Sequence, residues 1–338
     1  MSDTRPDLPP LPRMTPLEKI RYGGEALAFF AFIGLFRILG VDRASAVGGF
    51  IGRNIFYRTG ITNRARDNLR AAYPDMRKAE MEAVIVEMWD NLGRTIAEYA
   101  HHDKFSIDGP NPRIEIVNRD IADKAAASDR GVIFASGHFA NWEVFLHVAK
   151  QLQLDGGAVY RPVNNPYVDR FIVRQRMTHG PREQIEKGAR GTRRIFTLLR
   201  GGKSVFMLID QKTNEGLPIP FFGRDAMTTP TPAALALKLD SIVLLASSER
   251  MGGARFRVTI HEPITVERSG DHDRDVLALT TKLNTALESA IRKRPSQWLW
   301  IHRRWPKPGD KPFTRRARSA QDLSGAGVRV EREGSSLT

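Results

Sequence analysis

The stretch Val132-Ile-Phe-Ala-Ser-Gly-His-Phe-Ala-Asn-Trp-Glu143 is the part of the sequence that decides the fold class. Its first residues are apolar and β-branched, as in a buried strand, and Ser136-Gly137 then interrupts the apolar run. The segment becomes amphipathic from Asn141, a favourable N-cap residue, so we predict a strand, a tight turn and a helix. Open α/β sheets bind ligands at the carboxyl ends of their strands, and the predicted turn places His138 at such an end.

A histidine on this turn and a carboxylate in the first helical turn can act as a pair. Glu143, five residues after His138, would hold the imidazole in one tautomer, and the other ring nitrogen would take a proton from a hydroxyl. Taken alone, this spacing is common, and most such pairs are unrelated surface groups. A metal site has less support, because zinc ligands on one helix face are three or four residues apart and the chain has no cysteine. We therefore predict no metal and no organic cofactor, and we expect His147 to be a packed or rim histidine.

The composition of the 338-residue chain is that of a folded protein with a strongly basic charge balance. Hydrophobic residues make up 41% of the chain, enough for a substantial core, and the absence of cysteine excludes disulfides and a cysteine nucleophile. The formal net charge of +14 favours a polyanionic partner, such as nucleic acid, an anionic membrane surface or an acidic protein.

The N-terminal segment has the composition of a membrane attachment. Residues 1–14 are rich in proline and predict a flexible arm, and residues 26–36 form an uninterrupted apolar run with four phenylalanines. Eleven helical residues span roughly 16 Å, about half of a hydrocarbon core. We interpret 15–41 as a membrane-anchoring helix, either tilted with Arg37 reaching the interface or lying in the interface plane. A buried helix of a soluble domain remains the alternative.

The periodicity of the chain changes near residue 105. Apolar spacings of three and four predict a helical region over 42–105, whose last helix ends at His101 and His102 with both side chains on the surface. Over 106–306 the predicted strands (113–117, 132–135, 157–160, 204–209, 241–247 and 256–261) alternate with predicted helices (120–127, 166–178, 191–200, 231–239 and 273–294). This alternation predicts an α/β sheet covered on both sides, and 307–338 reads as a basic, disordered tail.

The segment Gln297-Trp-Leu-Trp-Ile-His-Arg-Arg-Trp305 combines aromatic and basic side chains. Such a segment can stack nucleotide bases, but Trp and Arg are also the residues that bind anionic head groups at a membrane interface. The sequence contains no recognised nucleic-acid fold signature. We therefore favour an anionic membrane surface as the partner and predict no nucleic acid.

Together, these segments resemble the late acyltransferases of lipid A biosynthesis, the lauroyl/myristoyl type of Gram-negative bacteria. The resemblance covers nearly the whole chain and depends on the order and spacing of several motifs, none of which is decisive alone. They are Asn68-Leu69, Tyr73-Pro74, Trp89, Gly93, Glu98, Gly137-His138 to Glu143, Tyr160-Arg161-Pro162, Asn165-Pro166, Asp210-Gln211, Phe221-Phe222-Gly223, Ala226, Thr228-Thr229-Pro230, Gln297-Trp298 and His302-Arg303-Arg304.

The resemblance implies membership of the glycerolipid acyltransferase superfamily, whose signature is His, four residues, then Asp or Glu. It implies a mixed sheet flanked by helices, with an acyltransferase domain over 42–306, and transfer of a fatty acyl chain from acyl-acyl carrier protein to a hydroxyl of a Kdo-bearing lipid A precursor. His138 would be the general base, and Glu143 would orient it and stabilise its cation. Ser136 lacks the Gly-x-Ser-x-Gly pattern of a nucleophile, so we prefer direct transfer.

The remaining candidate site residues are assigned to substrate binding or to the oxyanion. Arg161 is assigned to the developing oxyanion or to a substrate phosphate, because a guanidinium suits either. Asp210 would orient substrate or catalytic groups, although a turn cap explains it equally well. The others are Asn141, Asn164, Phe222, Gly223 and Thr228, of which the last three are expected to shape the pocket.

The implied partners account for the basic charge, since acyl carrier protein is acidic and the lipid acceptor carries phosphates and carboxylates. The implied location is the cytoplasmic face of the cell inner membrane, with attachment through the N-terminal helix. Two alternatives stay open at this stage. One is an acyltransferase of the same superfamily with a phospholipid, ornithine-lipid or glycolipid acceptor, and the other is a non-enzymatic membrane- or nucleic-acid-binding protein.

Overall fold

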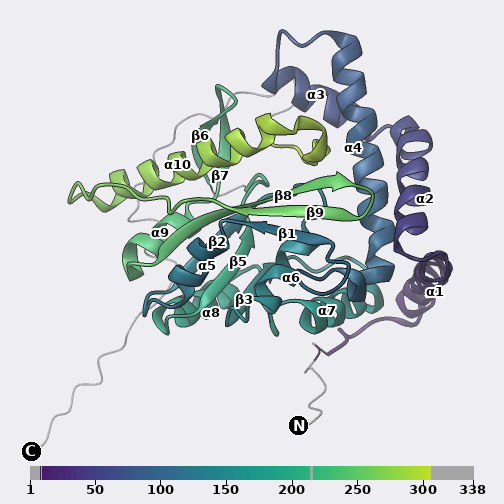
Figure 1. Cartoon of the computed structure of the whole chain (residues 1–338), viewed down its shortest axis with the longest axis horizontal. Helices are drawn as coiled ribbons and strands as arrows, with labels where there is room; N and C mark the ends of the chain where they lie inside the picture. Colours follow the sequence, from purple (N-terminus) through teal and green to yellow (C-terminus); the bar gives the residue numbers. More distant parts are fainter. Residues whose placement is uncertain (1–7, 9, 214–215, 306–338) are drawn as a thin grey trace, which may run out of the picture.

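The first part of the chain folds into helices that pack on one another (Figure 1). The computed structural model describes residue 8, residues 10–213 and residues 216–305. The helices of this part are α1 (Pro16–Leu39), α2 (Val41–Asn54), α3 (Thr62–Ala72) and α4 (Lys78–Glu98), with 3₁₀ turns η1 (Phe56–Arg58) and η2 (Tyr99–Lys104). Helices α2 and α4 approach so closely that a Cβ atom on Gly52 would lie 1.9 Å from the carbonyl oxygen of Trp89, so glycine is required at this crossing.

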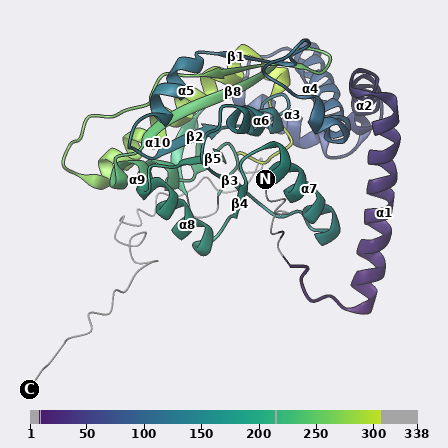
Figure 2. The same cartoon turned by 60° about the horizontal axis from the view of Figure 1, so that its bottom comes forward.

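Helix α1 lies along the edge of the molecule and is mostly exposed (Figure 2). A capping box between Thr15 and Glu18 starts it, and it is long and apolar enough to cross a membrane by length and composition. Only Ala26 and Phe36 are buried. Arg37 is exposed, and its guanidinium pairs with Asp103 and donates to the carbonyl of Ala100.

The centre of the molecule is a seven-stranded mixed sheet with the strand order β1-β9-β8-β2-β5-β3-β4. The strands are β1 (Ile114–Val117), β2 (Val132–Ser136), β3 (Gly156–Tyr160), β4 (Glu183–Glu186), β5 (Ser204–Leu208), β8 (Ile242–Gly252) and β9 (Arg255–Ile260). All neighbouring pairs are parallel except β8 and β9. The predicted α/β fold with a mixed sheet flanked by helices is confirmed.

Helices cover both faces of the sheet and bury its side chains. They are α5 (Arg119–Ala126), α6 (Glu143–Gln151), α7 (Pro166–His179), α8 (Ala189–Arg200), α9 (Thr231–Leu239) and α10 (His272–Lys293), and a hairpin of β6 (Leu217–Phe221) and β7 (Arg224–Thr228) lies beside α10. Because side chains alternate along a strand, Val132 and Phe134 of β2 join the cluster beneath α6, and Ile133 and Ala135 join the cluster beneath α10.

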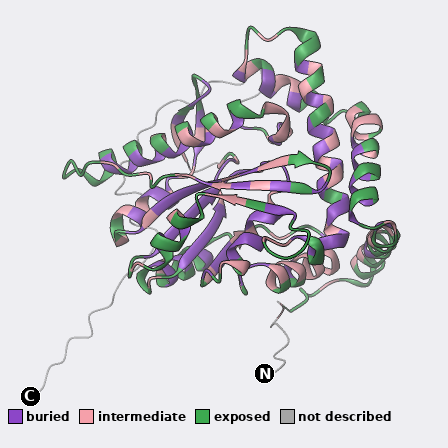
Figure 3. Ribbon diagram, in the orientation of Figure 1, coloured by how far each residue is buried: buried purple, intermediate pink, exposed green. Residues whose placement is uncertain are grey.

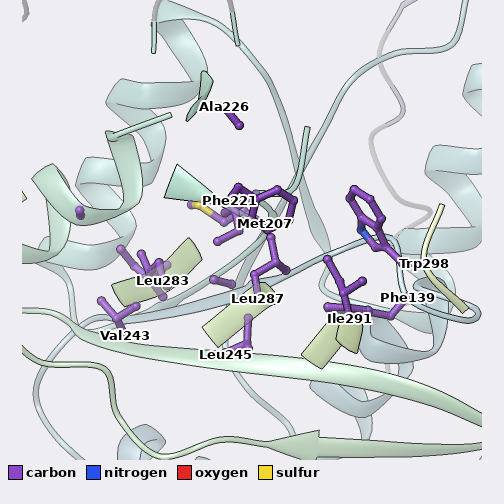
Figure 4. Close-up of a cluster of buried hydrophobic side chains, with 14 of the residues drawn as sticks. Phe139, Met207, Phe221, Ala226, Val243, Leu245, Leu283, Leu287, Ile291 and Trp298 are labelled. Carbon is purple, nitrogen blue, oxygen red and sulfur yellow. The ribbon is translucent and has the colours of Figure 1, made fainter. Parts of the chain in front are cut away.

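Figure 3 shows the buried residues concentrated in these central strands. Figure 4 shows the cluster beneath α10, where Leu283, Leu287 and Ile291 pack toward Val243 and Leu245 of β8. Burying one such side chain fully contributes about 1.5–3 kcal/mol, so this cluster holds α10 firmly against the sheet.

Several local predictions differ from the structure. Strand β4 was not predicted, because its four residues at the sheet edge include a single apolar side chain, and the two prolines of β6 obscured the hairpin. Helix α6 begins at Glu143 rather than Asn141. His101 and His102 are buried rather than exposed, because η2 folds them under α1 and α7. The tail predicted for 307–338 and most of the predicted arm lie outside the described residues.

Candidate active site

The register of β2 and β5 brings His138 and Asp210 together. Ser136 pairs with Leu208 at the ends of these parallel strands, and each functional residue lies two positions further on. The backbone N–H of His138 donates to Asp210 Oδ2 at 2.7 Å, and the Nδ1–Oδ1 distance is 2.8 Å. The imidazole is therefore held at two points by one carboxylate at the carboxyl edge of the sheet.

Asp210 is buried and surrounded by N–H donors. Its Oδ2 atom also accepts the indole N–H of Trp298 at 2.8 Å. Burial alone would raise the pKa of Asp210, but the charge of the His138 imidazole and these hydrogen bonds hold the pKa well below its usual range. An ionised carboxylate only accepts hydrogen bonds, so Nδ1 of His138 carries a hydrogen, and in the neutral tautomer that this selects the lone pair is on Nε2.

The free nitrogen of His138 faces two other polar groups. The amide nitrogen of Gln211 lies 3.4 Å from His138 Nε2 and 3.2 Å from Nε2 of His302. Burial and the nearby His138 lower the pKa of His302 to about 4, so His302 is neutral at pH 7. Asn68 of α3 donates to the carbonyl of His302 at 2.6 Å and so fixes the chain that carries this histidine.

A cavity of about 480 Å³ opens in front of His138, within the range of small-molecule sites. Its apolar wall is formed by α6, β3 and β5, through Phe145, Leu146, Ala158, Val159, Phe206 and Leu208. Polar groups line its other side, with Arg161, Asn164 and Lys187 exposed where it opens to solvent. The apolar wall and the polar opening of the cavity suit an elongated molecule with an apolar body and a polar end.

Glu143 also lines the cavity, but it does not orient His138 as predicted. Its carboxylate accepts from the guanidinium of Arg176 at 2.9 and 2.5 Å and from the hydroxyl of Tyr99. Burial alone would raise the pKa of Glu143, but Arg176 outweighs it and lowers the pKa to about 2. The physical reason for the difference is that Asp210 occupies the Nδ1 side, while Arg176 on α7 supplies the full positive charge that a buried carboxylate needs.

A cluster of three histidines lies behind Glu143. Nδ1 of His102 is 2.8 Å from Nε2 of His147, and the ring of His179 stacks on both at centroid distances of 5.8 and 5.5 Å. Burial lowers the pKa of His102 to about 4 and that of His147 well below its usual value. Within residues 8, 10–213 and 216–305, no three His, Asp or Glu side chains form a group that could hold a metal ion.

The structure separates the other predicted site residues into two sets. Arg161 and Asn164 lie at the opening of the cavity, as a substrate-binding role requires. Asn141 is buried instead, where its amide donates to Glu98 at 2.8 Å and its oxygen accepts the backbone N–H of Glu143 at 3.1 Å. Asn141 therefore positions the start of α6 and does not line the cavity.

Phe222, Gly223 and Thr228 belong to the β6–β7 hairpin, away from the cavity lining. Phe222 and Gly223 form its two-residue turn with positive φ values of 52° and 71°, which explains the glycine. Thr228 is buried and accepts from Arg304 at 2.7 Å. Phe222 and Thr228 contact the C-terminal segment, and the hairpin packs on α10, so the expected pocket-shaping role is not seen.

Sequence reasoning did not single out four residues that the structure brings to the site. They are Arg176, Gln211, His302 and Trp298, and the last three belong to motifs quoted for the family resemblance. Their position relative to His138 depends on strand order and on the return of the C-terminal segment, neither of which one sequence reveals. Gln211 follows Asp210 directly, and that adjacency was the available signal.

An imidazole held by a buried carboxylate beside a cavity with an apolar wall is an arrangement that can serve general acid–base chemistry. The comparisons with known proteins specify the class. Residues 13–307 match the family model described as bacterial lipid A biosynthesis acyltransferase. The chain belongs to this family, and it is an acyltransferase.

Curated relatives agree with the family match at low identity. The chain is 26% identical over 249 residues, covering 71% of this chain and 77% of the relative, to the lipid A biosynthesis palmitoleoyltransferase of Escherichia coli (strain K12). It is 24% identical over 253 residues to a lipid A biosynthesis acyltransferase of Haemophilus influenzae, covering 73% and 78%. It is 23% identical over 248 residues to the lipid A biosynthesis lauroyltransferase of E. coli K12, covering 70% and 76%.

Proposed function

We propose that this acyltransferase moves a fatty acyl chain from acyl-acyl carrier protein to a hydroxyl of a Kdo-bearing lipid A precursor. The family and the names of its relatives support lipid A as the acceptor class. The observation that carries the chemistry is the His138–Asp210 pair, with Nε2 of His138 facing the cavity. The apolar wall of the cavity suits a fatty acyl chain, and its basic opening suits an anionic substrate.

In the proposed reaction, His138 Nε2 takes the proton of the acceptor hydroxyl while the oxygen attacks the thioester carbonyl. The tetrahedral intermediate then expels the thiolate of the donor, which receives that proton from the imidazolium, so that an ester and a free thiol are formed. Asp210 stabilises the imidazolium and keeps the imidazole in the productive tautomer. The amide of Gln211, 3.4 Å from His138 Nε2, and the guanidinium of Arg161 in the cavity lining are the donors that we assign to the oxyanion.

Glu143 takes a different part in this proposal from the one expected from sequence spacing. Its ion pair with Arg176 joins the first turn of α6 to α7, and both residues line the cavity. The pair therefore keeps one side of the cavity rigid and polar next to the reacting groups. His138 and Asp210 remain the residues assigned to proton transfer.

Membrane attachment through α1, at the cytoplasmic face of the inner membrane, completes the proposal. The helix exposes Leu17, Ile20, Leu27, Leu35 and Ile38, each 60% or more accessible. The loop after β3 contacts α1 through Asn165, whose amide donates to the carbonyl of Tyr22 at 2.9 Å. A lipid acceptor held by the membrane would therefore reach the cavity from the α1 side.

The test is transfer of labelled acyl groups from a panel of acyl-carrier-protein thioesters to the Kdo-bearing lipid A precursor, with wild type and His138→Ala. We expect product from wild type and a loss of about a hundredfold or more in the variant. The exposed surface histidine variant His272→Ala, at the start of α10, is the matched control and should retain wild-type activity. Product only with a phospholipid, ornithine-lipid or glycolipid acceptor would replace the proposed acceptor, and full activity of His138→Ala would refute the mechanism.

A further inference from the structure

The opening of the cavity has two sides with different chemical character. On one side, the loop after β3 rests on α1, with the amide of Asn165 donating to Tyr22 and to Glu25 at 3.0 Å. On the other side, β4 leads directly into α8, and Lys187 between them lines the cavity. Figure 2 shows α1 and α8 at opposite ends of this region, with α7 and strands β3 and β4 between them.

The exposed apolar side chains lie on the α1 side. Among the described residues, the large exposed hydrophobic side chains include ten between Leu17 and Ile61 and none between residues 164 and 250. The large exposed hydrophobic side chains therefore gather on the N-terminal helices, and none of them lies on α8.

Helix α8 and its flanks are strongly basic. Residues 187–203 contain six Lys or Arg and no acidic residue. Arg194 pairs with Glu183 and Lys203 pairs with Asp155, but Arg190 and Arg193 are exposed and form no ion pair within the described part of the chain. Their charges are available to a partner.

The first turn of α8 is held close to the cavity. A Cβ atom on Gly191 would lie 2.0 Å from the carbonyl oxygen of Glu186, the last residue of β4, so the glycine lets the helix rest directly on the strand end. The backbone N–H of Lys187 also donates to the carbonyl of Tyr160 at 2.9 Å. The exposed stripe that begins at Arg190 therefore starts three residues from a side chain that lines the cavity.

We propose that Arg190 and Arg193 of α8, together with Lys187 and Arg161 at the cavity opening, form the docking surface for the acidic acyl carrier protein. The inference rests on the proposed function, which names this protein as the donor. The carrier presents its thioester on a phosphopantetheine arm, so the arm must enter the cavity while the protein stays outside. Lys187 and Arg161 flank that route and match the phosphate of the arm, and Arg190 and Arg193 match the acidic protein surface.

This arrangement separates the two substrates in space. The soluble donor approaches over α8 from water, whereas the lipid acceptor approaches beside α1 from the membrane. Neither substrate has to leave before the other binds, as direct transfer between them requires.

The test compares Arg190→Glu/Arg193→Glu with Arg200→Glu on the same helix. Arg200 is exposed at the carboxyl end of α8, about 15 Å beyond Arg190 and next to the amino end of β5, so it lies outside the proposed surface and tests charge reversal far from the cavity. We expect the double variant to lose about tenfold or more in kcat/KM for acyl-acyl carrier protein at low salt, through KM, and Arg200→Glu to stay within about twofold of wild type. Acyl-pantetheine, a donor without the protein, should be used equally by all three enzymes.

Binding of holo-acyl carrier protein is measured in parallel by fluorescence anisotropy, because this readout does not need turnover. Equal binding by the double variant and wild type, or equal losses in Arg200→Glu, overturns the docking surface. Weaker attachment of the double variant to phosphatidylglycerol vesicles, with unchanged carrier binding, assigns the stripe to lipid and also overturns it. If wild type binds the carrier but makes no product from any thioester, the proposed function is refuted. The docking surface is then judged from the binding data alone.

Discussion

Replacing Asp210 with asparagine tests the active-site assignment most directly. Three N–H groups point at the Asp210 carboxylate, from the backbone of His138, the ring of His138 and the indole of Trp298, at 2.7–2.8 Å. Asparagine has one acceptor oxygen and one NH₂ group. Donor–donor contacts are fewest when the asparagine oxygen accepts from the backbone N–H of His138 and from the indole of Trp298. The NH₂ group then faces Nδ1 of His138.

The consequence for catalysis follows from the tautomer. An NH₂ group facing Nδ1 makes that nitrogen an acceptor, so the hydrogen moves to Nε2 and the imidazole can no longer take a proton from the substrate. Loss of the correct tautomer in a serine-protease triad lowers kcat by about 10⁴-fold, which corresponds to about 5 kcal/mol at 1.36 kcal/mol per tenfold. We expect a loss of that order for Asp210→Asn, with the KM values for donor and acceptor nearly unchanged.

The assay is the initial rate of labelled acyl transfer at saturating substrates, with the melting temperature measured on the same preparation. Glu143→Gln is the comparison variant, because Glu143 is the carboxylate that sequence spacing paired with His138. We expect a loss of about tenfold in that variant, well below the loss in Asp210→Asn. Retention of more than a tenth of the activity by folded Asp210→Asn, or equal losses in the two variants, would refute the assignment of Asp210 as the positioning residue.

Three further predictions concern stability. Glu143→Gln leaves the guanidinium of Arg176 buried without its anion and should lower the free energy of unfolding by about 3–5 kcal/mol. Urea denaturation measures this change, and an unchanged unfolding midpoint would contradict a stabilising role of the buried ion pair. Leu287→Ala, at 0% exposure in α10, should cost about 2–5 kcal/mol and lower the melting temperature by several degrees, whereas Leu277→Ala, 39% exposed on the same helix, should change it little. The pKa of His102 is about 4 in the folded protein against 6.5 for an unperturbed histidine, so its contribution to stability is complete above pH 6.5 and is lost as the pH falls toward 4. At pH 5 that loss is about 2 kcal/mol, and the acid shift of the melting temperature should be smaller in His102→Asn than in wild type.

The strand–turn–helix around His138 was predictable because its signals are local. An apolar run, a glycine-containing break and an amphipathic segment follow one another, and the structure has β2, the turn and α6 in that order. Helix α10 and strand β9 were predictable for the same reason, since each has a clear period of hydrophobic residues.

The partner of His138 was not predictable in the same way. Glu143 is close to His138 in sequence, but Asp210 is 72 residues away and becomes a neighbour only because β5 pairs with β2. Strand order is a property of the whole chain, so sequence spacing favoured the wrong carboxylate as the group bound to Nδ1. Burial of His101 and His102 depended similarly on α1 and α7, which cover the end of α4.

The insertion of β5 between β2 and β3 has a consequence for biosynthesis. Strands β2 and β3 follow each other along the chain with α6 between them, yet each pairs with β5 and not with the other. A nascent chain that has left the ribosome only up to residue 203 therefore has both strands but lacks the strand that joins them. Release of β5 joins β2 to β3 and, two residues later, brings Asp210 to His138, whereas β8, which pairs with the other edge of β2, comes later in the chain. The proposed catalytic pair of His138 and Asp210 therefore forms only once β5 has joined β2 to β3.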